Sequence, residues 1–359
     1  MEDLALMKNY FNKNSLLLSA LIFSLTEFAI AGAVLSKGEQ AGWVSVLNHD
    51  KAMPGKFSYI APYSGWVVEI DLDGVVLNSF RIPSKYHRHL GGGADIEWIP
   101  SLQEFLITGP QTGVFRSSLD GNITWSCDTA FISHDSDYQD DGSVFFVNGW
   151  DEIGNNEPIL TWMSKDCSII DELRASEIDL REERFNKNIK DKTHTHTNAL
   201  QRIRPKLIML SLRNYDEIVL VSLKKRKIVR RYYKAFQVHD PMPFDSSVES
   251  KQMEFYYADE SKGGRLMLSR SKPKRERPKT IWNSAKHEPE WKRGDAINER
   301  LWWPIRTLEL SPNGNFLISG SAYLGQVTPE GELVWEVRLK GFENQSKNKD
   351  FVYKASFRE

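Results

Sequence analysis

Cysteine is scarce in this sequence, with only Cys127 and Cys167 among 359 residues. Two cysteines cannot build a disulfide-dense scaffold, and they supply too few thiolates for a cysteine-rich structural zinc site. A single bridge is the most they allow. It would span 167 − 127 = 40 residues.

Charge of one predominant sign is also missing. The chain has 47 Lys and Arg against 48 Asp and Glu, a formal net charge of −1, so no global field favours nucleic acid or an acidic membrane. Two local basic runs occur, at residues 224–231 and 272–279. We interpret the first as a hairpin turn and the second as a proline-broken loop. We therefore expect no nucleic-acid partner.

The familiar phosphate and hydrolase motifs are absent as well. There is no Walker pattern, no Gly-x-Ser-x-Gly elbow and no glycine-rich loop that opens a helix. The glycines at 91–93 precede an expected strand. We therefore expect no cofactor.

Only one long hydrophobic run is present, at residues 15–35 after Lys8 and Lys13. Its length suits a membrane-spanning helix, and its small residues near 29–33 also suit signal-peptide cleavage. Glu27 within it costs about 2.5–3.5 kcal/mol on insertion scales, which disfavours a permanent anchor. A signal peptide, a transmembrane anchor and a buried core helix all remain open. We expect residues 1–38 to form this segment and the rest to be exported, periplasmic or otherwise extracytoplasmic.

From residue 39 to 359 the sequence predicts an all-β domain. Short alternating strands are separated by Gly, Asp, Asn and Pro, and they recur about every forty residues in about six copies. The clearest copy is residues 303–337, with hairpin turns at 312–314 and 329–331. The pattern predicts a six-bladed β-propeller preceded by the N-terminal hydrophobic helix, and two β-sandwich domains are the alternative.

Two segments deserve separate expectations. Residues 168–186 are the one stretch with the pattern of a long amphipathic helix. Residues 351–357 resemble a last strand that could close the ring against the first blade.

Polar side chains gather where strands are expected to enter the centre of the ring. A propeller's innermost strands line a central channel, so residues at their start are candidates for a ligand site. Six of the eight histidines fall at or just before such positions. The candidates are Asp95 with upstream His87 and His89; His134, Asp135 and Asp137; His194, His196 and Asn198; His239 and Asp240; and Arg306.

Period-two geometry would place His194, His196 and Asn198 on one face of a strand. These residues suit a tetrahedral oxyanion, because imidazole, amide and guanidinium groups supply donors without a central carboxylate. Arg213 would lie within reach of His196 if its strand pairs with the histidine strand. A solvated edge without a ligand, a surface position for Arg213, and a metal held by two histidines with His239 or Asp137 are the alternatives.

The segments just described resemble the arylsulfotransferase family of six-bladed propellers over about residues 55–359. The most specific resemblance is a His-x-Asn at 196–198, a strand ending in Ser-x-Arg at 211–213, and the strand and basic turn at 218–229. A Gln-x-His at 237–239 is similar to the segment that carries the family's nucleophile. The resemblance implies an exported transferase that moves a sulfuryl group from an aryl sulfate to a phenol.

Carried over position by position, the resemblance implies that His239 becomes sulfated. It implies that His196, Asn198 and Arg213 bind the sulfuryl oxygens, and we add His134, Asp95 and Arg306 as substrate-binding candidates. No metal is expected. The family commonly has His-His-Asp at the second blade, whereas this chain keeps only Asp95, so His87 or His89 would have to substitute.

Two further functions stay open from the residues themselves. One is a non-catalytic propeller that binds a ligand or partner in its channel. The other is a metal-dependent hydrolase or lyase built on His194, His196 and His239. A bridge between adjacent blades is a further expectation, since Cys127 and Cys167 are about one repeat apart.

Overall fold

The computed structural model describes thirteen stretches of the chain. These are residues 35–61, 64–149, 158–180, 185, 194–233, 235, 237–243, 253–259, 265–269, 278–284, 305–320, 323–340 and 352–359. Residues 35–359 form one compact unit. The hydrophobic run at 15–34 lies outside the described residues, so its role stays an expectation. In the described part of the chain, no helix is both long enough and apolar enough to cross a membrane.

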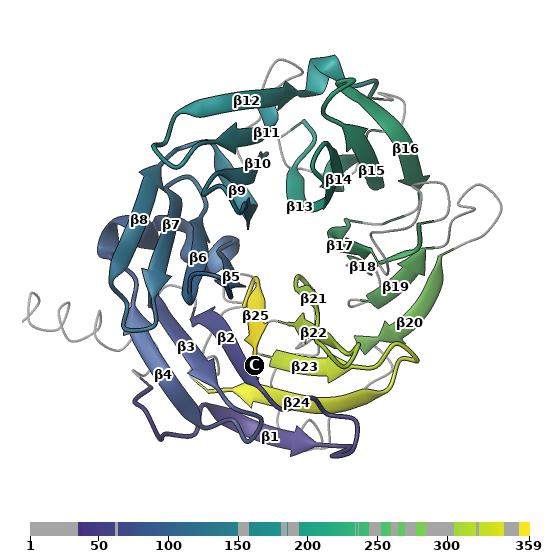
Figure 1. Cartoon of the computed structure of the whole chain (residues 1–359). Helices are drawn as coiled ribbons and strands as arrows, with labels where there is room; N and C mark the ends of the chain where they lie inside the picture. The colour runs from purple at the N-terminus through teal and green to yellow at the C-terminus, as the bar shows by residue number, and fades with distance from the viewer. Residues whose placement is uncertain are drawn as a thin grey trace, which may run out of the picture. The chain divides into compact units, whose positions relative to one another are not determined.

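Six antiparallel sheets stand around a common centre, each presenting one short edge strand inward (Figure 1). We number them as blades in ring order. The strands of blades 1 to 3, from the inside outward, are β25 (Ala355–Arg358), β2 (Lys56–Ala61), β3 (Trp66–Ile70) and β4 (Val76–Arg81); β5 (Asp95–Ile99), β6 (Glu104–Gly109), β7 (Gly113–Ser118) and β8 (Ile123–Asp128); and β9 (Ile132–Tyr138), β10 (Val144–Asn148), β11 (Pro158–Met163) and β12 (Ile169–Arg174).

Blades 4 to 6 follow the same plan, except that blade 6 has a fifth strand. Their strands are β13 (Thr197–Arg204), β14 (Leu207–Leu212), β15 (Glu217–Ser222) and β16 (Lys227–Tyr233); β17 (His239–Pro243), β18 (Phe255–Asp259), β19 (Arg265–Ser269) and β20 (Lys279–Asn283); and β21 (Leu308–Leu310), β22 (Phe316–Ser319), β23 (Tyr323–Val327), β24 (Leu333–Leu339) and β1 (Gly42–Val46). The six-bladed prediction is confirmed, and the two-sandwich alternative is wrong.

The ring is closed twice by strands from opposite ends of the chain. C-terminal β25 pairs with β2 as the innermost strand of blade 1, with Phe57 opposite Phe357. N-terminal β1 pairs with β24 as the outermost strand of blade 6, with Val44 opposite Val337. The prediction that residues 351–357 close the ring is therefore confirmed. The closure by β1 is a second one, which the repeat pattern does not reveal.

Apolar side chains fill the wedge between every pair of neighbouring blades. Six separate core clusters result, one at each junction of the ring. At the closing junction the indole of Trp335 stacks on Phe57 with ring centres 4.5 Å apart and donates a hydrogen bond to Leu72 O at 2.7 Å. Since the blades rest on each other rather than on a central core, the middle of the ring is left to polar side chains.

The helix expected at 168–186 is wrong within its described part. Ile169–Arg174 form β12, the outermost strand of blade 3, and a short 3-10 turn, η2 (Ala175–Glu177), follows. Most side chains of an outermost strand face solvent, so apolar residues are sparse in its sequence. Sparse apolar residues among polar ones also occur in an amphipathic helix, which is why the two were confused. Leu173 and Ala175 are buried, two positions apart as in a strand, whereas Ile169 is 62% exposed.

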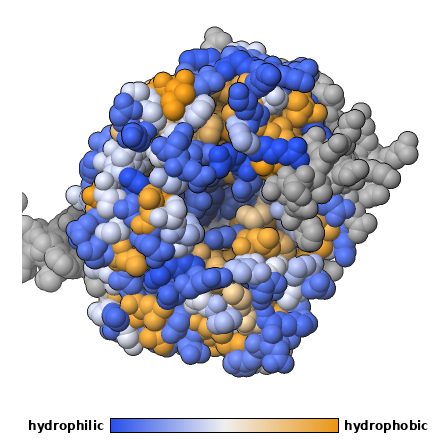
Figure 2. All heavy atoms as spheres, in the orientation of Figure 1, coloured by the Kyte–Doolittle hydropathy of each residue, from blue (hydrophilic) through white to orange (hydrophobic). Residues whose placement is uncertain are grey.

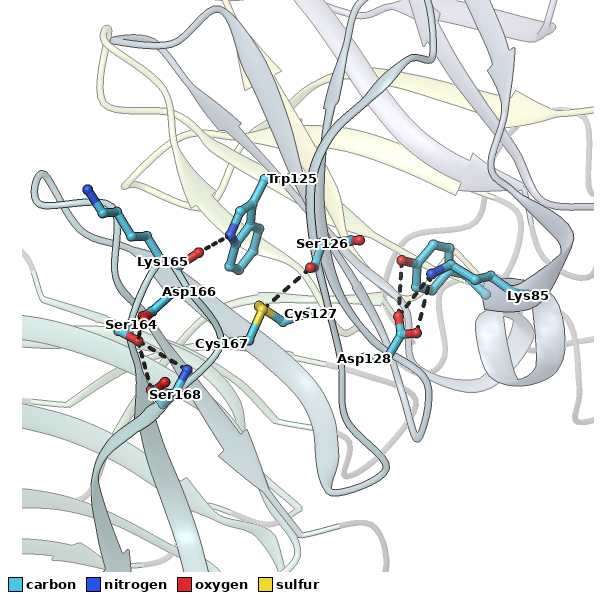
Figure 3. Close-up of a disulfide and its surroundings, with 11 residues drawn as sticks. Lys85, Trp125, Ser126, Cys127, Asp128, Ser164, Lys165, Asp166, Cys167 and Ser168 are labelled. Atoms are coloured by element: carbon cyan, nitrogen blue, oxygen red, sulfur yellow. Dashed lines mark hydrogen bonds and ion pairs between the residues drawn. A yellow bond between two sulfur atoms is a disulfide. The ribbon is translucent and has the colours of Figure 1, made fainter.

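A disulfide joins blades 2 and 3, as the spacing predicts. Cys127 lies on β8, and Cys167 lies in the turn between β11 and β12, with Cα atoms 5.6 Å apart (Figure 3). Beside it, Trp125 Nε1 donates to Lys165 O at 2.6 Å across the same junction. The bridge therefore ties the outermost strand of blade 2 to a turn of blade 3.

Candidate functional site

Two polar clusters lie at the centre of the ring. Three pairs of adjacent residues contribute one member to each cluster. The histidine–arginine cluster comprises His134, His196, Arg213, His239, Arg306 and Tyr353. The lysine–carboxylate cluster comprises Asp95, Asp135, Asp240 and Lys354. The pairs 134–135, 239–240 and 353–354 are each split between the two clusters. On β9 the cause is strand alternation, because successive side chains point opposite ways, whereas Asp240 has a left-handed backbone with φ +39°. A hollow lined largely by hydrophilic residues opens at the centre of the face shown in Figure 2.

His239, the first residue of β17, is fully buried. Its Nδ1 lies 2.8 Å from Gln237 O, and its Nε2 lies 2.7 Å from Arg306 Nη1. A carbonyl only accepts and a guanidinium only donates, so the pattern fixes the tautomer: Nδ1 carries the proton and Nε2 carries the lone pair. The backbone at Gln237 has φ +44°, which turns its carbonyl toward the ring. The Nε2 lone pair is thus directed toward an arginine.

His134, on β9, lies against backbone that has no side chain. Its Nδ1 is 3.2 Å from Gly93 O, and a Cβ added at Gly93 would fall 1.9 Å from that same nitrogen. A side chain at residue 93 would therefore collide with the imidazole of His134, and glycine leaves that ring its space.

The ring of Tyr353 contacts three other members of the histidine–arginine cluster. His134 stacks on it with ring centres 4.6 Å apart, and His239 meets it edge-on at 5.9 Å. The guanidinium of Arg306 lies 5.1 Å from the same ring centre, within cation–π range. Tyr353 is buried and belongs to the closing segment. The sequence pattern of that segment indicated only a closing strand, so Tyr353 was not among the predicted site residues.

Both buried histidines are held neutral. Burial, then Arg306, Arg213 and His134, lower the pKa of His239 well below its ordinary range. Burial is also the main cause of the lowered pKa of His134, followed by His196 and Arg306. Two guanidinium groups therefore supply the positive charge here, while the imidazoles keep their lone pairs at neutral pH.

His196, Asn198 and Arg213 are brought together by blade 4. The pairing of β13 with β14 puts Arg213 N 3.4 Å from His196 O, as the sequence analysis expected. The ring of His196 is 5.6 Å from that of His134. Asn198 is fully buried; its Oδ1 accepts from Ser211 Oγ, and its Nδ2 has no hydrogen-bond partner among the described residues. An unused amide donor is thus buried beside the cluster.

His194 does not join this group, so the prediction that residues 194, 196 and 198 share one strand face is wrong. The strand starts at Thr197, and His196 has φ +45°, which breaks the alternation. His194 Nε2 instead lies 2.8 Å from Tyr215 Oη. His87 is also directed elsewhere, with Nε2 2.6 Å from Ile82 O. The side chain of His89 lies outside the described residues.

Asp95 belongs to the lysine–carboxylate cluster rather than to the histidines. Lys354 Nζ lies 2.6 Å from Asp135 Oδ1, 2.9 Å from Asp240 Oδ1 and 3.7 Å from Asp95 Oδ1. Asp135 Oδ2 also accepts from Leu200 N, and Asp240 Oδ2 accepts from Leu308 N. One ammonium therefore links blades 2, 3 and 5 to the closing segment.

The carboxyl groups of this cluster bind protons more tightly than usual. Burial raises the pKa of Asp135 to about 7 and that of Asp240 to about 6, and it raises the pKa of Asp95 as well. Lys354 opposes the effect in each case. Three carboxyls around one ammonium cannot all be ionised cheaply.

A cavity of about 260 Å³ lies next to this cluster. Its polar walls include Glu97, Asp137 and Glu309 in addition to the three aspartates, and its apolar walls include Ile96, Met242 and Leu308. The sequence analysis missed Glu97, Glu309 and Lys354. The signal was present, because Glu97 and Glu309 follow Asp95 and Thr307 by two positions on innermost strands.

The first basic run lies where it was expected, in the turn between β15 and β16. Its Arg226 pairs with Asp171 at 3.1 Å and with Glu177 at 2.6 Å, which ties blade 4 to blade 3. Most of the second run lies outside the described residues.

Metal coordination finds no geometric support in the part of the chain described. No three His, Cys, Asp or Glu side chains there are arranged to hold a metal ion. The separation of His194 from His196 and His239 is the reason the proposed three-histidine site does not form.

Comparison with known proteins shows the fold only. The sequence matches no family model and no curated protein. Among solved structures, a protein of unknown function from Bacteroides caccae has a TM-score of 0.54 at 11% identity, covering 86% of this chain and 100% of that one. The WD40 β-propeller domain of Doa1 scores 0.47 at 12% identity (90% and 88% covered), and virginiamycin B lyase from Staphylococcus aureus scores 0.39 at 12% (68% and 70%). The chain is a six-bladed β-propeller of the all-β class, and its chemistry has to be argued from its own centre.

Proposed function

We propose that this protein transfers a sulfuryl group between phenolic oxygens through a sulfated His239, as the resemblance to arylsulfotransferases implies. One observation carries the proposal: a fully buried, neutral imidazole has its Nε2 lone pair directed at Arg306, 2.7 Å away. A structural histidine would need no guanidinium against its lone pair. An arginine there suits an anion held next to the nitrogen.

The chemistry balances in two half-reactions. In the first, Nε2 of His239 attacks the sulfur of an aryl sulfate, an N–S bond forms, and the S–O(aryl) bond breaks with the electron pair leaving on the phenolate. In the second, the oxygen of the acceptor phenol attacks the same sulfur, and the N–S bond returns its pair to Nε2. The hydrogen bond from Nδ1 to Gln237 O keeps the reactive tautomer in both steps.

The surrounding donors fit the sulfuryl oxygens. Arg306 moves from Nε2 to an incoming oxygen, and Arg213 acts on the same charge from blade 4. Asn198 contributes the amide donor that has no partner among the described residues. His134 is the proposed base that takes the proton of the acceptor phenol in the second half-reaction, because its lowered pKa keeps the imidazole neutral before that step.

Export belongs to the same proposal. A sulfuryl donor that is itself an aryl sulfate removes the need for a cytoplasmic nucleotide donor. The Cys127–Cys167 disulfide suits an oxidising compartment. We propose that residues 1–38 direct the chain there, either as a cleaved signal or as an anchor.

The test is turnover of 4-nitrophenyl sulfate with phenol as acceptor, for the wild type, for His239→Ala and for the control His49→Ala. His49 is an exposed histidine away from the cluster. We expect turnover by the wild type and by His49→Ala, none by His239→Ala, and no effect of a chelator. Intact mass after mixing with donor alone should show one added sulfuryl group, lost in His239→Ala.

Two results would overturn the proposal. Turnover retained by folded His239→Ala would exclude the covalent step. Absence of both turnover and mass increase in the folded wild type, with several aryl sulfates, would leave a non-catalytic channel that binds its ligand without transforming it.

A further inference from the structure

A second chamber, separate from the histidines, lies at the carboxylate side of the channel. We call it the carboxylate chamber; it is the 260 Å³ cavity bounded by Asp95, Glu97, Asp135, Asp137, Asp240 and Glu309. Six carboxyl groups from blades 2, 3, 5 and 6 thus face one cavity whose described cationic lining residue is Lys354.

Lys354 shows what the carboxyls are arranged to hold. Its ammonium is buried and lies within 4 Å of all three aspartates, at 2.6, 2.9 and 3.7 Å. These aspartates raise its pKa well above the ordinary value, against the opposing effect of burial. An alkylammonium is therefore stable in this environment, and the protein supplies one from its own chain.

The remaining carboxyls lack such a partner. Glu97 Oε2 and Asp137 Oδ2 are buried oxygens that line the chamber and have no hydrogen-bond partner among the described residues. Glu309 accepts from Phe357 N at 2.9 Å but forms no ion pair with any described residue. Burial raises the pKa of Asp137 to about 6, against the lowering effects of Arg202 and of a hydrogen bond with Gln139, and Asp137 Oδ2 has no hydrogen bond among the described residues. Buried acceptors without donors are costly, so these two oxygens call for a donor from outside the chain.

The ligand's other groups are constrained by the walls. Ile96, Met242 and Leu308 offer apolar surface, so a short alkyl body can pack beside a charged end. A bare divalent ion suits the chamber less well, because the carboxyls surround a cavity and do not converge in the described structure on one coordination centre. A diamine would bring its own ammonium groups to these carboxyls, in addition to the one that Lys354 already supplies.

We propose that the carboxylate chamber binds a small organic ammonium ligand, with the ammonium held by Glu97 and Asp137 and an alkyl body against the apolar wall. The proposal does not depend on sulfuryl transfer. A bound ammonium would supply hydrogen-bond donors to both oxygens at once. Such charge-assisted hydrogen bonds are stronger than those between neutral groups.

The first experiment is calorimetric titration of the full chain with putrescine and, separately, with 1,4-butanediol. The two probes share chain length and differ in charge. We expect putrescine to bind at one site per chain and butanediol to show no binding. Equal binding of the two probes, or no binding of putrescine at millimolar concentration, would overturn the proposal.

Variants then locate the site. Glu97→Gln with Asp137→Asn keeps shape and removes charge, and Asp50→Asn removes one exposed carboxylate elsewhere. We expect the double variant to weaken putrescine at least about tenfold and Asp50→Asn to change it little. Unchanged affinity in a double variant that melts cooperatively would show that putrescine binds elsewhere, which refutes this chamber as its site.

Discussion

The disulfide between blades 2 and 3 allows a stability prediction from chain length alone. Removing the bridge frees a loop of 40 residues in the unfolded chain. The loop-entropy relation gives about 13 cal/mol/K for this length, or about 4 kcal/mol at 25 °C. A bridge between two outer strands restrains little in the folded ring, so most of this effect should appear as lost stability.

The measurement compares the oxidised wild type, the reduced wild type and Cys127→Ala with Cys167→Ala. Urea unfolding, followed by tryptophan fluorescence and by far-UV circular dichroism, gives the free energy of unfolding of each. Reduction leaves every side chain in place and so isolates the cross-link. The double variant adds a small cavity, because Cys127 is buried against the blade 2–blade 3 core.

We expect reduction to lower the free energy of unfolding by about 4 kcal/mol and the double variant to lose slightly more. The double variant must not respond to reductant, which serves as the control. A loss below about 1 kcal/mol on reduction would refute the reasoning, because it would mean that the unfolded chain gains little freedom from the opened loop.

Two further predictions concern the centre of the ring. Gly93→Ala should lower the free energy of unfolding by about 1–3 kcal/mol and reduce turnover of 4-nitrophenyl sulfate, because the added Cβ would fall 1.9 Å from His134 Nδ1. The backbone at residue 93, with φ 168°, tolerates alanine, so the clash is the cause of the effect. Unchanged unfolding and turnover would contradict this prediction. Stability should fall by about 1 kcal/mol as pH rises from 6.5 to 8, since burial raises the pKa of Asp135 to about 7, and a group with a raised pKa loses its stabilising contribution as pH passes its folded value. Below pH 6.5 the buried His134 and His239, whose pKa values are lowered, act in the opposite direction. In Asp135→Asn, the midpoint of urea unfolding should depend less on pH than in the wild type. An unchanged dependence would show that Asp135 is not the group that titrates.

The ring was predictable because its information is local. Each blade carries its own turn residues and alternating strands, so a forty-residue period can be read without knowing any long-range contact. The closing strand at 351–357 was also visible as an unpaired strand. The outer strand β1 was missed because its partner, β24, lies nearly three hundred residues later, and no local pattern names a partner.

The site was only partly predictable, and the reason is again geometric. His134, His239 and Arg306 meet because each lies at the inner edge of its blade. Asp95 occupies a similar sequence position but faces the lysine side, where its Oδ1 lies 3.7 Å from Lys354 Nζ. His194 was misassigned because one left-handed residue, His196, ends the strand pattern. A single φ angle of this kind leaves no clear mark in sequence.

The double closure has a consequence for synthesis on the ribosome. Blade 1 lacks its inner strand, and the centre lacks Tyr353 and Lys354, until residues 353–358 have left the exit tunnel. Blade 6 completes its sheet with β1, which is made before all the other strands of that blade. A nascent chain can therefore assemble blades 2 to 5 early, but it completes neither polar cluster before residues 353 and 354 emerge. A chain cut before residue 353 would lack the inner strand of blade 1 and one member of each polar cluster.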